Sequence, residues 1–196
     1  VLLYGPAGTG KTTLARIIAH TTHAEFVEVS AITGTVKDLR REIEAAESRL
    51  LTAGRRTILF IDEIHRFTRS QQDALLHAVE DRIVVLIGAT TENPYFEVNS
   101  ALISRSRVVE LHALSDEAID ELIQRALESE DGLAGAFVLD EAARKEIVTL
   151  AGGDGRAALT SLELASQMVD VPESADNKAS EPLVITKQNV LEANPR

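Results

Sequence analysis

The chain has 196 residues, a length that corresponds to one or two domains. It contains no cysteine, which excludes disulfide bonds, thiolate metal sites and cysteine nucleophiles. With 20 Lys and Arg against 31 Asp and Glu, the formal net charge is −11, so the chain as a whole is not a polycation that coats nucleic acid. It shows no secretory leader and no apolar run near the roughly 20 residues of a membrane span, so we expect a cytoplasmic protein. Because Val1 already lies within an apolar run, we also expect a piece of a longer protein.

The first half alternates short apolar segments with longer amphipathic ones. The apolar segments predict strands at Val1–Tyr4, Phe26–Val29, Thr57–Ile61, Val84–Ala89 and Arg107–Leu111. Such continuous apolar strands indicate a parallel sheet that is buried on both faces. The intervening segments predict helices at Lys11–His20, Val36–Ala53, Ser70–Asp81 and Asn99–Ser104. This alternation is typical of an α/β fold with a parallel sheet flanked by helices.

The second half shows helical periodicity. Capping residues precede apolar-periodic segments and predict helices that begin at Ser115, Asp140 and Thr186, with a further helix over Arg156–Val169. The polar segment Pro172–Pro182 predicts a surface loop, for which we find no function. We therefore expect two domains, an α/β core at residues 1–112 and a small all-α domain at residues 113–196.

Residues Gly5–Thr12 match the phosphate-binding pattern G-x-x-x-x-G-K-[ST] and lie between a predicted strand and a predicted helix, as the pattern requires. The glycines let backbone N–H groups turn toward phosphate oxygens, and the helix N-terminus favours an anion. Lys11 is expected to pair with the β- and γ-phosphates of ATP, and the Thr12 hydroxyl to bind Mg²⁺. The alternative is a chance Gly-rich turn. The nucleotide-binding candidates in this segment are Gly5, Pro6, Ala7, Gly8, Thr9, Gly10, Lys11, Thr12 and Thr13.

Two carboxylates, Asp62 and Glu63, follow a predicted strand that is expected to be buried. Strand C-termini are where ligands bind in open α/β sheets. Asp62 is therefore the expected partner of Mg²⁺, and Glu63 the residue that polarises the attacking water. A plain acidic turn is the alternative. With a phosphate-binding loop nearby in the fold, this pair favours hydrolysis over transfer to an acceptor.

Three further residues are candidates for contact with the γ-phosphate. Thr91 ends the strand after Val84 and can hydrogen-bond the water or the phosphate; a turn-forming Thr is the alternative. Arg105 can stabilise transition-state charge when another subunit supplies it. Arg156 begins a helix of the second domain and can close over the phosphate. Either arginine can instead be a surface ion-pair residue.

Lys37, Arg40 and Arg41 share one face of a predicted helix, because residues three and four apart are neighbours there. Such a patch can contact the phosphate backbone of DNA. Asp38 and Glu42 lie beside it, so an ordinary salt-bridged, solvated face is the alternative.

The order of these motifs resembles the AAA+ ATPases, and among them the clamp-loader and RuvB-like branch. The resemblance assigns Walker A to Gly5–Thr12, Walker B to residues 58–63, sensor 1 to Thr91, the arginine finger to Arg105 and sensor 2 to Arg156. Ser106 stands where the clamp-loader S-R-C motif has cysteine. The segments FIDEIHRFTRSQQDALL, IGATTENPYFEVNSALISRSRV and GGDGRAALTSLELA are similar to the replication-associated recombination protein A family, which includes the Werner-helicase-interacting ATPase.

That resemblance implies a homo-oligomeric, DNA-stimulated ATPase, tetrameric in the full-length family, that acts at stalled replication forks and single-strand/duplex junctions. It also implies association with single-stranded-DNA-binding protein, a helical lid at 113–196, and a location at the nucleoid in bacteria or the nucleus in eukaryotes. In clamp loaders the equivalent of the Lys37 helix tracks DNA. The family's segment before the phosphate-binding loop and its C-terminal oligomerisation domain are expected outside residues 1–196.

Several alternatives stay open from the sequence. A clamp-loader subunit is one, and a RuvB-like branch-migration motor, with a winged-helix domain after Arg196, is another. A P-loop kinase is disfavoured by Asp62 and Glu63 and by the lack of a second substrate-binding insertion. A non-hydrolysing scaffold is disfavoured because Lys11, Glu63 and Arg105 are all present.

Overall fold

The computed structural model describes residues 1–170 and 181–195. It divides the chain into two compact units. The first consists of Val1–Pro6 and Gly10–His112, and the second of Ala7–Thr9 with the chain from Ala113 onward. No helix in the described residues is both long and apolar enough to cross a membrane.

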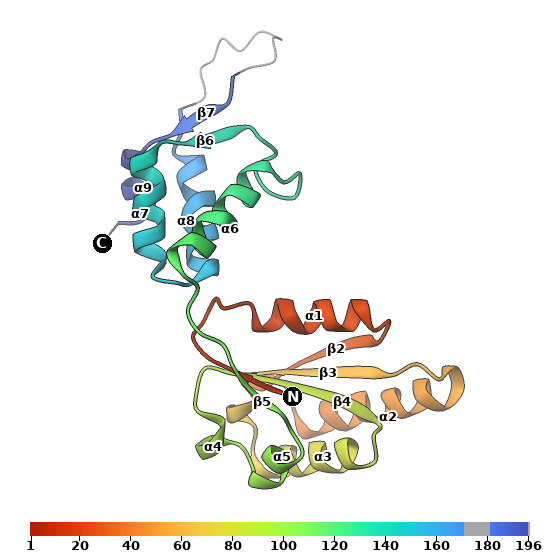
Figure 1. The fold of residues 1–196 in the computed structure, drawn as a ribbon. Helices are drawn as coiled ribbons and strands as arrows, with labels where there is room; N and C mark the ends of the chain where they lie inside the picture. Colours follow the sequence, from red (N-terminus) through yellow and green to blue (C-terminus); the bar gives the residue numbers. More distant parts are fainter. Residues whose placement is uncertain (171–180, 196) are drawn as a thin grey trace. The chain divides into compact units, whose positions relative to one another are not determined.

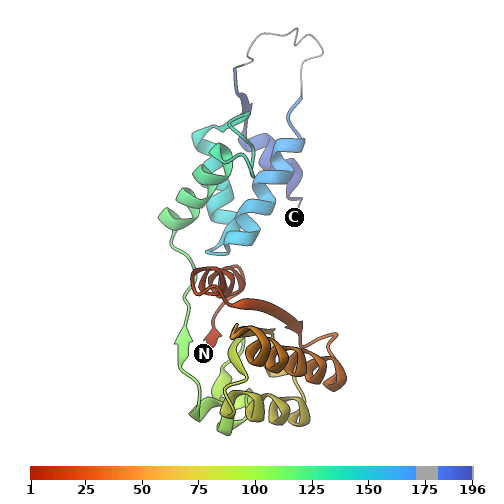
Figure 2. The ribbon, with the colours of Figure 1, turned by 90° about the vertical axis from the view of Figure 1, so that its right-hand side faces the viewer.

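The first unit is built on a parallel five-stranded sheet with the strand order β2-β3-β4-β1-β5. Figures 1 and 2 show helix α1 over one face of this sheet and helices α2 and α3 over the other. The fold class predicted for this part of the chain is confirmed. Its strands are β1 (Leu2–Tyr4), β2 (Glu25–Ser30), β3 (Thr57–Asp62), β4 (Val84–Thr90) and β5 (Val108–Glu110).

Alternating residues of the central strands enter two separate cores, because successive side chains of a strand point to opposite faces. Leu59 and Ile61 of β3 pack on the face that α2 and α3 cover, together with buried residues such as Leu39 and Leu75. Ile58 and Phe60 pack on the face that α1 covers. Burial on both faces explains why β3 has no polar alternation.

The helices of the first unit mostly begin at side-chain caps. Thr35 and Thr68 each accept a hydrogen bond from the third helical N–H in a reciprocal capping box, at the starts of α2 and α3. Asn93 and Asn99 cap two short helices through their side-chain oxygens, which accept from the second helical N–H, that of Tyr95 and that of Ala101; the sequence analysis did not expect the helix that begins after Asn93. The helices are α1 (Lys11–Thr21), α2 (Val36–Ala53), α3 (Arg69–Glu80), α4 (Pro94–Glu97) and α5 (Ser100–Ser104).

The second unit packs helices around a core that includes Ile119, Ile123, Ile147 and Leu162. Its elements are α6 (Asp116–Glu128), β6 (Phe137–Leu139), α7 (Glu141–Ala151), α8 (Gly155–Gln167), β7 (Leu183–Ile185) and α9 (Lys187–Ala193). Ser115, Asp140 and Thr186 cap α6, α7 and α9, as predicted from the sequence.

The expectation of an all-α second domain needs a correction. Strands β6 and β7 form a two-stranded parallel sheet, with Phe137 opposite Leu183 and Leu139 opposite Ile185. Three-residue strands give too short a pattern for periodicity to detect, and their pairing joins segments far apart in the sequence. Most of the predicted loop Pro172–Pro182 lies outside the described residues.

Candidate functional site

The candidate site lies at the carboxyl edge of the parallel sheet. Strand β1 runs into the loop that begins at Gly5, β3 ends at Asp62, and β4 ends at Thr90. Tyr4 and Thr90 are direct partners in the sheet, and the Gly5 N–H donates to the Thr90 carbonyl oxygen at 3.2 Å. The phosphate-binding sequence and the acidic pair therefore reach the same edge, where α/β proteins bind ligands.

The phosphate-binding loop ends in an uncapped helix. Gly8 and Gly10 have φ values of 66° and 84°, in the left-handed region that favours glycine. Gly10 is the N-cap of α1, and a glycine has no side chain that could cap it, in contrast to Thr35 and Thr68 at the starts of α2 and α3. The first turn of α1 also contains no acid. This N-terminus is therefore suited to an anionic ligand.

Lys11 lies against the loop that precedes it. Its side chain is buried, with 8% exposure, and its Nζ donates to the carbonyl oxygens of Gly5 at 2.8 Å and Pro6 at 2.6 Å. A buried ammonium requires such acceptors, because its desolvation is costly. Thr12 is half-buried and Thr13 is exposed on α1.

Glu63 has an unusual backbone. Its φ and ψ of 53° and 47° are left-handed, a conformation that a residue with a long side chain rarely adopts. Its N–H donates to Asp62 Oδ1 at 3.1 Å, and its carbonyl accepts from the Arg66 N–H at 2.8 Å. Such strain clusters at functional sites, where the surrounding structure imposes it.

The Glu63 carboxylate belongs to a small hydrogen-bonded network. Thr91 Oγ1 donates to Glu63 Oε2 at 3.4 Å, so the structure brings two predicted site residues together. His65 Nδ1 lies 3.2 Å from the same oxygen and 2.8 Å from the hydroxyl of Thr90, which is fully buried. The sequence analysis assigned no role to His65 or Thr90. The signal in the sequence was that His65 follows Glu63 by two residues. The tight turn of the three-residue 3₁₀ helix (Ile64–Arg66) brings the His65 ring close to the Glu63 carboxylate.

The donor set suits a magnesium ion bound together with a nucleotide. Thr12 offers a hydroxyl and Asp62 a half-buried carboxylate, which are the oxygen ligands that Mg²⁺ prefers. Within the residues that the structure describes, no group of three or more His, Asp or Glu could hold a metal ion by itself. Mg²⁺ usually takes one or two protein ligands and completes its shell with water and substrate phosphates.

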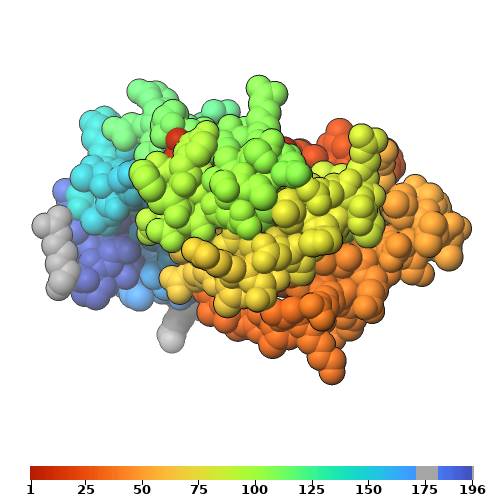
Figure 3. Space-filling view, turned by 90° about the horizontal axis from the view of Figure 1, so that it is seen from below, coloured from red at the N-terminus to blue at the C-terminus, as the bar shows by residue number. Residues whose placement is uncertain are grey.

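Arg105 lies at the opposite edge of the sheet. It follows α5 and precedes β5, and its Nη2 pairs with Oε1 of Glu80 at 2.6 Å. Glu80 ends α3 just before β4, so both residues precede the amino ends of parallel strands. Figure 3 shows this α3 and α5 surface in yellow and green. The arrangement separates Arg105 from Glu63 of its own chain by the length of the sheet.

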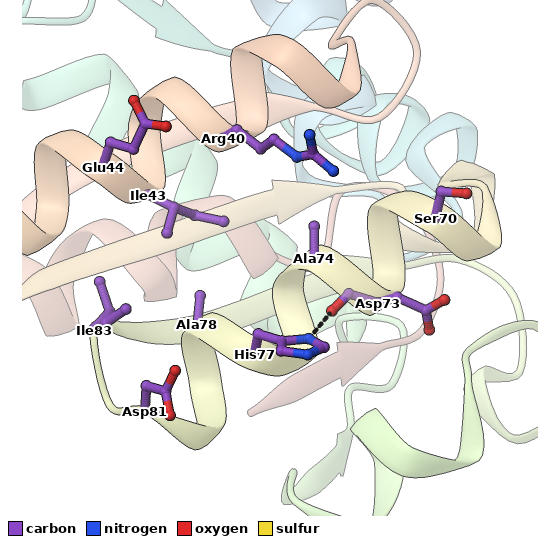
Figure 4. A pocket seen from close by; sticks show the side chains of 10 residues that line it. All are labelled: Arg40, Ile43, Glu44, Ser70, Asp73, Ala74, His77, Ala78, Asp81 and Ile83. Carbon is purple, nitrogen blue, oxygen red and sulfur yellow. Dashed lines mark hydrogen bonds between the residues drawn. The ribbon is translucent and has the colours of Figure 1, made fainter.

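The basic residues of α2 differ in their surroundings. Arg41 pairs with Asp38 at 3.6 Å and Glu42 at 3.3 Å, as the salt-bridged alternative expects. Arg40 lines a groove of about 520 Å³ between α2 and α3, whose other charged lining residues include Glu44, Asp73 and Asp81 (Figure 4). This acidic lining is unsuited to a phosphate. Lys37 is exposed, and its contact with DNA stays a prediction.

Arg156 is the second residue of α8 in the second unit and is exposed. Its N–H donates to Asp154 Oδ1 at 2.8 Å, so Asp154 caps the helix that carries the arginine. Its role toward ATP stays a prediction.

Comparison with known proteins agrees with this geometry. A sequence model of the ATPase family associated with various cellular activities (AAA) matches residues 1–115. Replication-associated recombination protein A of Escherichia coli is 49% identical over 176 residues, which are 89% of this chain and 39% of that protein. The protein of the same name from Haemophilus influenzae is 45% identical over 179 residues, 90% of this chain and 39% of that protein. The chain therefore spans 39% of the length of these relatives.

The fold also matches a solved structure. RuvB of Thermotoga maritima, described as a Holliday junction branch migration motor, superposes with a TM-score of 0.76 and 28% identity. The match covers 98% of this chain and 59% of RuvB. Together with the motif order and the sheet topology, these matches show an ATPase domain. The chain belongs to the ATPase family associated with various cellular activities (AAA), and its predicted resemblance to replication-associated recombination protein A is confirmed.

Proposed function

We propose that this chain binds ATP with Mg²⁺ and hydrolyses it to ADP and phosphate by attack of water on the γ-phosphorus, with Glu63 as the general base. The observation that carries the proposal is the contact of the Glu63 carboxylate with Thr91 at the sheet edge where the phosphate-binding loop begins. A carboxylate held by neighbouring side chains at a ligand-binding edge is suited to orient a water for in-line attack.

Nucleotide binding involves the loop and the first turn of α1. The backbone N–H groups of the loop and of the first turn of α1, except at Pro6, which has none, would donate to the phosphates, and Lys11 would exchange its carbonyl acceptors at Gly5 and Pro6 for phosphate oxygens. Thr12 and Asp62 hold Mg²⁺, which neutralises charge on the β- and γ-phosphates when it is bound. For Arg156, at the start of α8 in the second unit, we infer a sensor 2 role toward ATP.

Completion of the site requires a second copy of the chain. Arg105 lies at the sheet edge opposite its own Glu63, so it reaches a γ-phosphate only in a neighbouring subunit. An arginine supplied in trans is worth roughly 10³–10⁵ in rate, so isolated subunits turn over slowly. The full-length assembly is a homo-oligomer, which we infer to be a tetramer.

The substrate on which the ATPase acts is DNA. The names of the similar proteins refer to replication and recombination, and the RuvB match refers to a branched DNA. We infer action at stalled forks and single-strand/duplex junctions, with single-stranded-DNA-binding protein as a partner and with the exposed Lys37 of α2 as the candidate DNA contact. We infer that the full-length protein acts in the cytoplasm, at the nucleoid in a bacterium, or in the nucleus in a eukaryote.

The structural match favours one second candidate, a RuvB-like motor that moves four-way junctions. The two functions differ in the DNA that stimulates ATP turnover. Forked or gapped DNA stimulates a fork-acting ATPase, and a four-way junction stimulates a branch-migration motor.

The test is ATP turnover per subunit of the full-length protein at increasing protein concentration, with forked, gapped and four-way DNA and without DNA. We expect turnover to rise with both concentration and DNA ends. Glu63→Gln should abolish turnover but leave ATP binding, which fluorescent-nucleotide titration measures. Turnover that is independent of concentration and DNA would contradict an oligomeric motor, and normal turnover by Glu63→Gln would contradict the assigned base.

A further inference from the structure

His65 lies within reach of both the Walker B glutamate and the end of β4. Its Nδ1 lies 3.2 Å from Glu63 Oε2 and 2.8 Å from Thr90 Oγ1. We propose that His65 is a positioning residue that orients the Glu63 carboxylate for water activation, and that Thr90 in turn orients His65. The proposal rests on the proposed ATPase function and deepens it.

The local fold places the imidazole firmly. The 3₁₀ helix from Ile64 to Arg66 is anchored by Ile64, which is fully buried, and by a hydrogen bond from the Phe67 N–H to the Ile64 carbonyl at 3.1 Å. The His65 side chain itself is only 15% exposed. A half-enclosed ring with two polar contacts has little rotational freedom, so it can restrict the side chain that it touches.

The contacts favour a hydrogen on Nδ1 of His65. An ionised carboxylate has no proton to donate, so the contact with Glu63 is favourable only when Nδ1 of His65 is protonated. Thr90 Oγ1 accepts the Glu92 N–H at 3.0 Å and has a second lone pair for His65. One N–H therefore faces two acceptors, and the imidazole is held between β4 and the Walker B turn.

The consequence for catalysis concerns one oxygen of the carboxylate. His65 and Thr91 both approach Oε2 of Glu63, at 3.2 and 3.4 Å. With Oε2 held by two donors, we assign Oε1 to the attacking water. A general base must lie within hydrogen-bond reach of the proton that it removes, and a misplacement of about 1 Å can cost about 100-fold in rate.

The test compares His65→Asn, His65→Gln and His65→Ala in the full-length protein with DNA. The amide N–H of asparagine lies near the position of Nδ1, whereas that of glutamine lies near Nε2. We expect His65→Asn to keep most of kcat, and His65→Gln and His65→Ala to lose about 10- to 100-fold in kcat with little change in KM for ATP. His77→Ala is the matched control, because that exposed histidine bonds only within α3.

Equal activity of the asparagine and glutamine variants would overturn the proposal, as would an unchanged kcat in His65→Ala. Should His65→Ala fail to fold, the asparagine and glutamine pair still decides, since both keep an amide of similar size. Glu63→Gln is measured in parallel. Turnover that survives Glu63→Gln contradicts the proposed function itself, whereas loss there with normal His65 variants contradicts only the positioning role.

Discussion

Arg105 and Glu80 form an ion pair of 2.6 Å at the amino edge of the sheet, remote from the phosphate-binding loop of the same chain. The two side chains are 45% and 37% exposed. Pairs this exposed contribute about 0–1 kcal/mol, because water screens them and ordering two long side chains costs entropy. Arg105 can therefore exchange Glu80 for a phosphate at small cost.

The first prediction concerns rescue between subunits. Arg105→Ala and Glu63→Gln should each be inactive alone, because one lacks the arginine it supplies to a neighbour and the other lacks its own base. Mixed oligomers contain interfaces with an intact Glu63 facing an intact Arg105, so partial activity should return. Steady-state ATP turnover of the two full-length variants, alone and mixed, measures this. No recovery in oligomers shown to be mixed, for example by tagged co-purification, would count against a trans arginine.

A second prediction follows from the weakness of the ion pair. Glu80→Gln should leave maximal turnover unchanged or slightly raised, because the substitution removes a competitor for Arg105. Arg107→Gln is a control on an exposed arginine nearby. A large loss of turnover in Glu80→Gln, with normal oligomerisation, would show that the pair is needed to place Arg105.

Lys11 gives a third prediction. Lys11→Ala removes the ammonium that contacts Gly5 and Pro6, and with it the charge expected to pair with the β- and γ-phosphates. A bound nucleotide stabilises the folded protein by RT ln(1 + L/Kd), where L is the free ligand concentration, so the melting temperature rises with the logarithm of the ligand concentration divided by Kd. We expect ATP with Mg²⁺ to stabilise the wild-type chain and to have little effect on Lys11→Ala, as differential scanning fluorimetry measures. If ATP with Mg²⁺ raised the melting temperature of both proteins equally, Lys11 would be excluded from the binding site.

Much of this arrangement could be predicted from the sequence. The central strands and long helices follow from periodicity and capping residues, such as Thr186 before α9. The phosphate-binding loop is recognisable from the spacing of its glycines and lysine, because phosphate binding requires that spacing. The sequence also places Thr91 at a strand end near the phosphate site, whereas its contact with Glu63 is found only in the structure.

Other features depend on tertiary geometry that a linear pattern does not contain. The left-handed backbone of Glu63 arises from a single tight turn. The contact of His65 with Thr90 joins residues that lie 25 positions apart in the sequence. The groove lined by Arg40 depends on how α2 packs on α3. The pairing of β6 with β7 joins strands too short to show alternation.

A fourth prediction concerns acid stability. Hydrogen bonds from the Thr35 hydroxyl and backbone N–H hold the pKa of Asp38 below its ordinary value of 3.8. A lowered folded-state pKa stabilises the protein above the unfolded-state value, and this contribution is lost as the pH falls from about 4 through the folded-state pKa. Asp38→Asn should therefore flatten the pH dependence of urea unfolding in this window. If the free energy of unfolding depended on pH equally in Asp38→Asn and the wild-type protein, the Asp38 carboxylate would not contribute this pH-dependent stability.

A fifth prediction tests a buried polar side chain. Gln71 is 6% exposed; its Oε1 accepts the Thr68 N–H at 2.9 Å and its Nε2 donates to the Gly34 carbonyl at 2.9 Å. Gln71→Ala leaves both partners without this side chain, which should lower the free energy of unfolding by about 1–3 kcal/mol. Gln167→Ala, on an exposed position of α8, should change it by less than about 0.5 kcal/mol. Urea denaturation of both variants measures the difference.

At Glu63, the left-handed backbone that stability disfavours is combined with the carboxylate that catalysis is proposed to need. A glycine there would relieve about 1–2 kcal/mol of backbone strain, so Glu63→Gly can yield a sturdier protein that no longer turns over ATP. Variants designed to stabilise this domain should keep Glu63, and their ATPase activity should be measured together with their melting temperature.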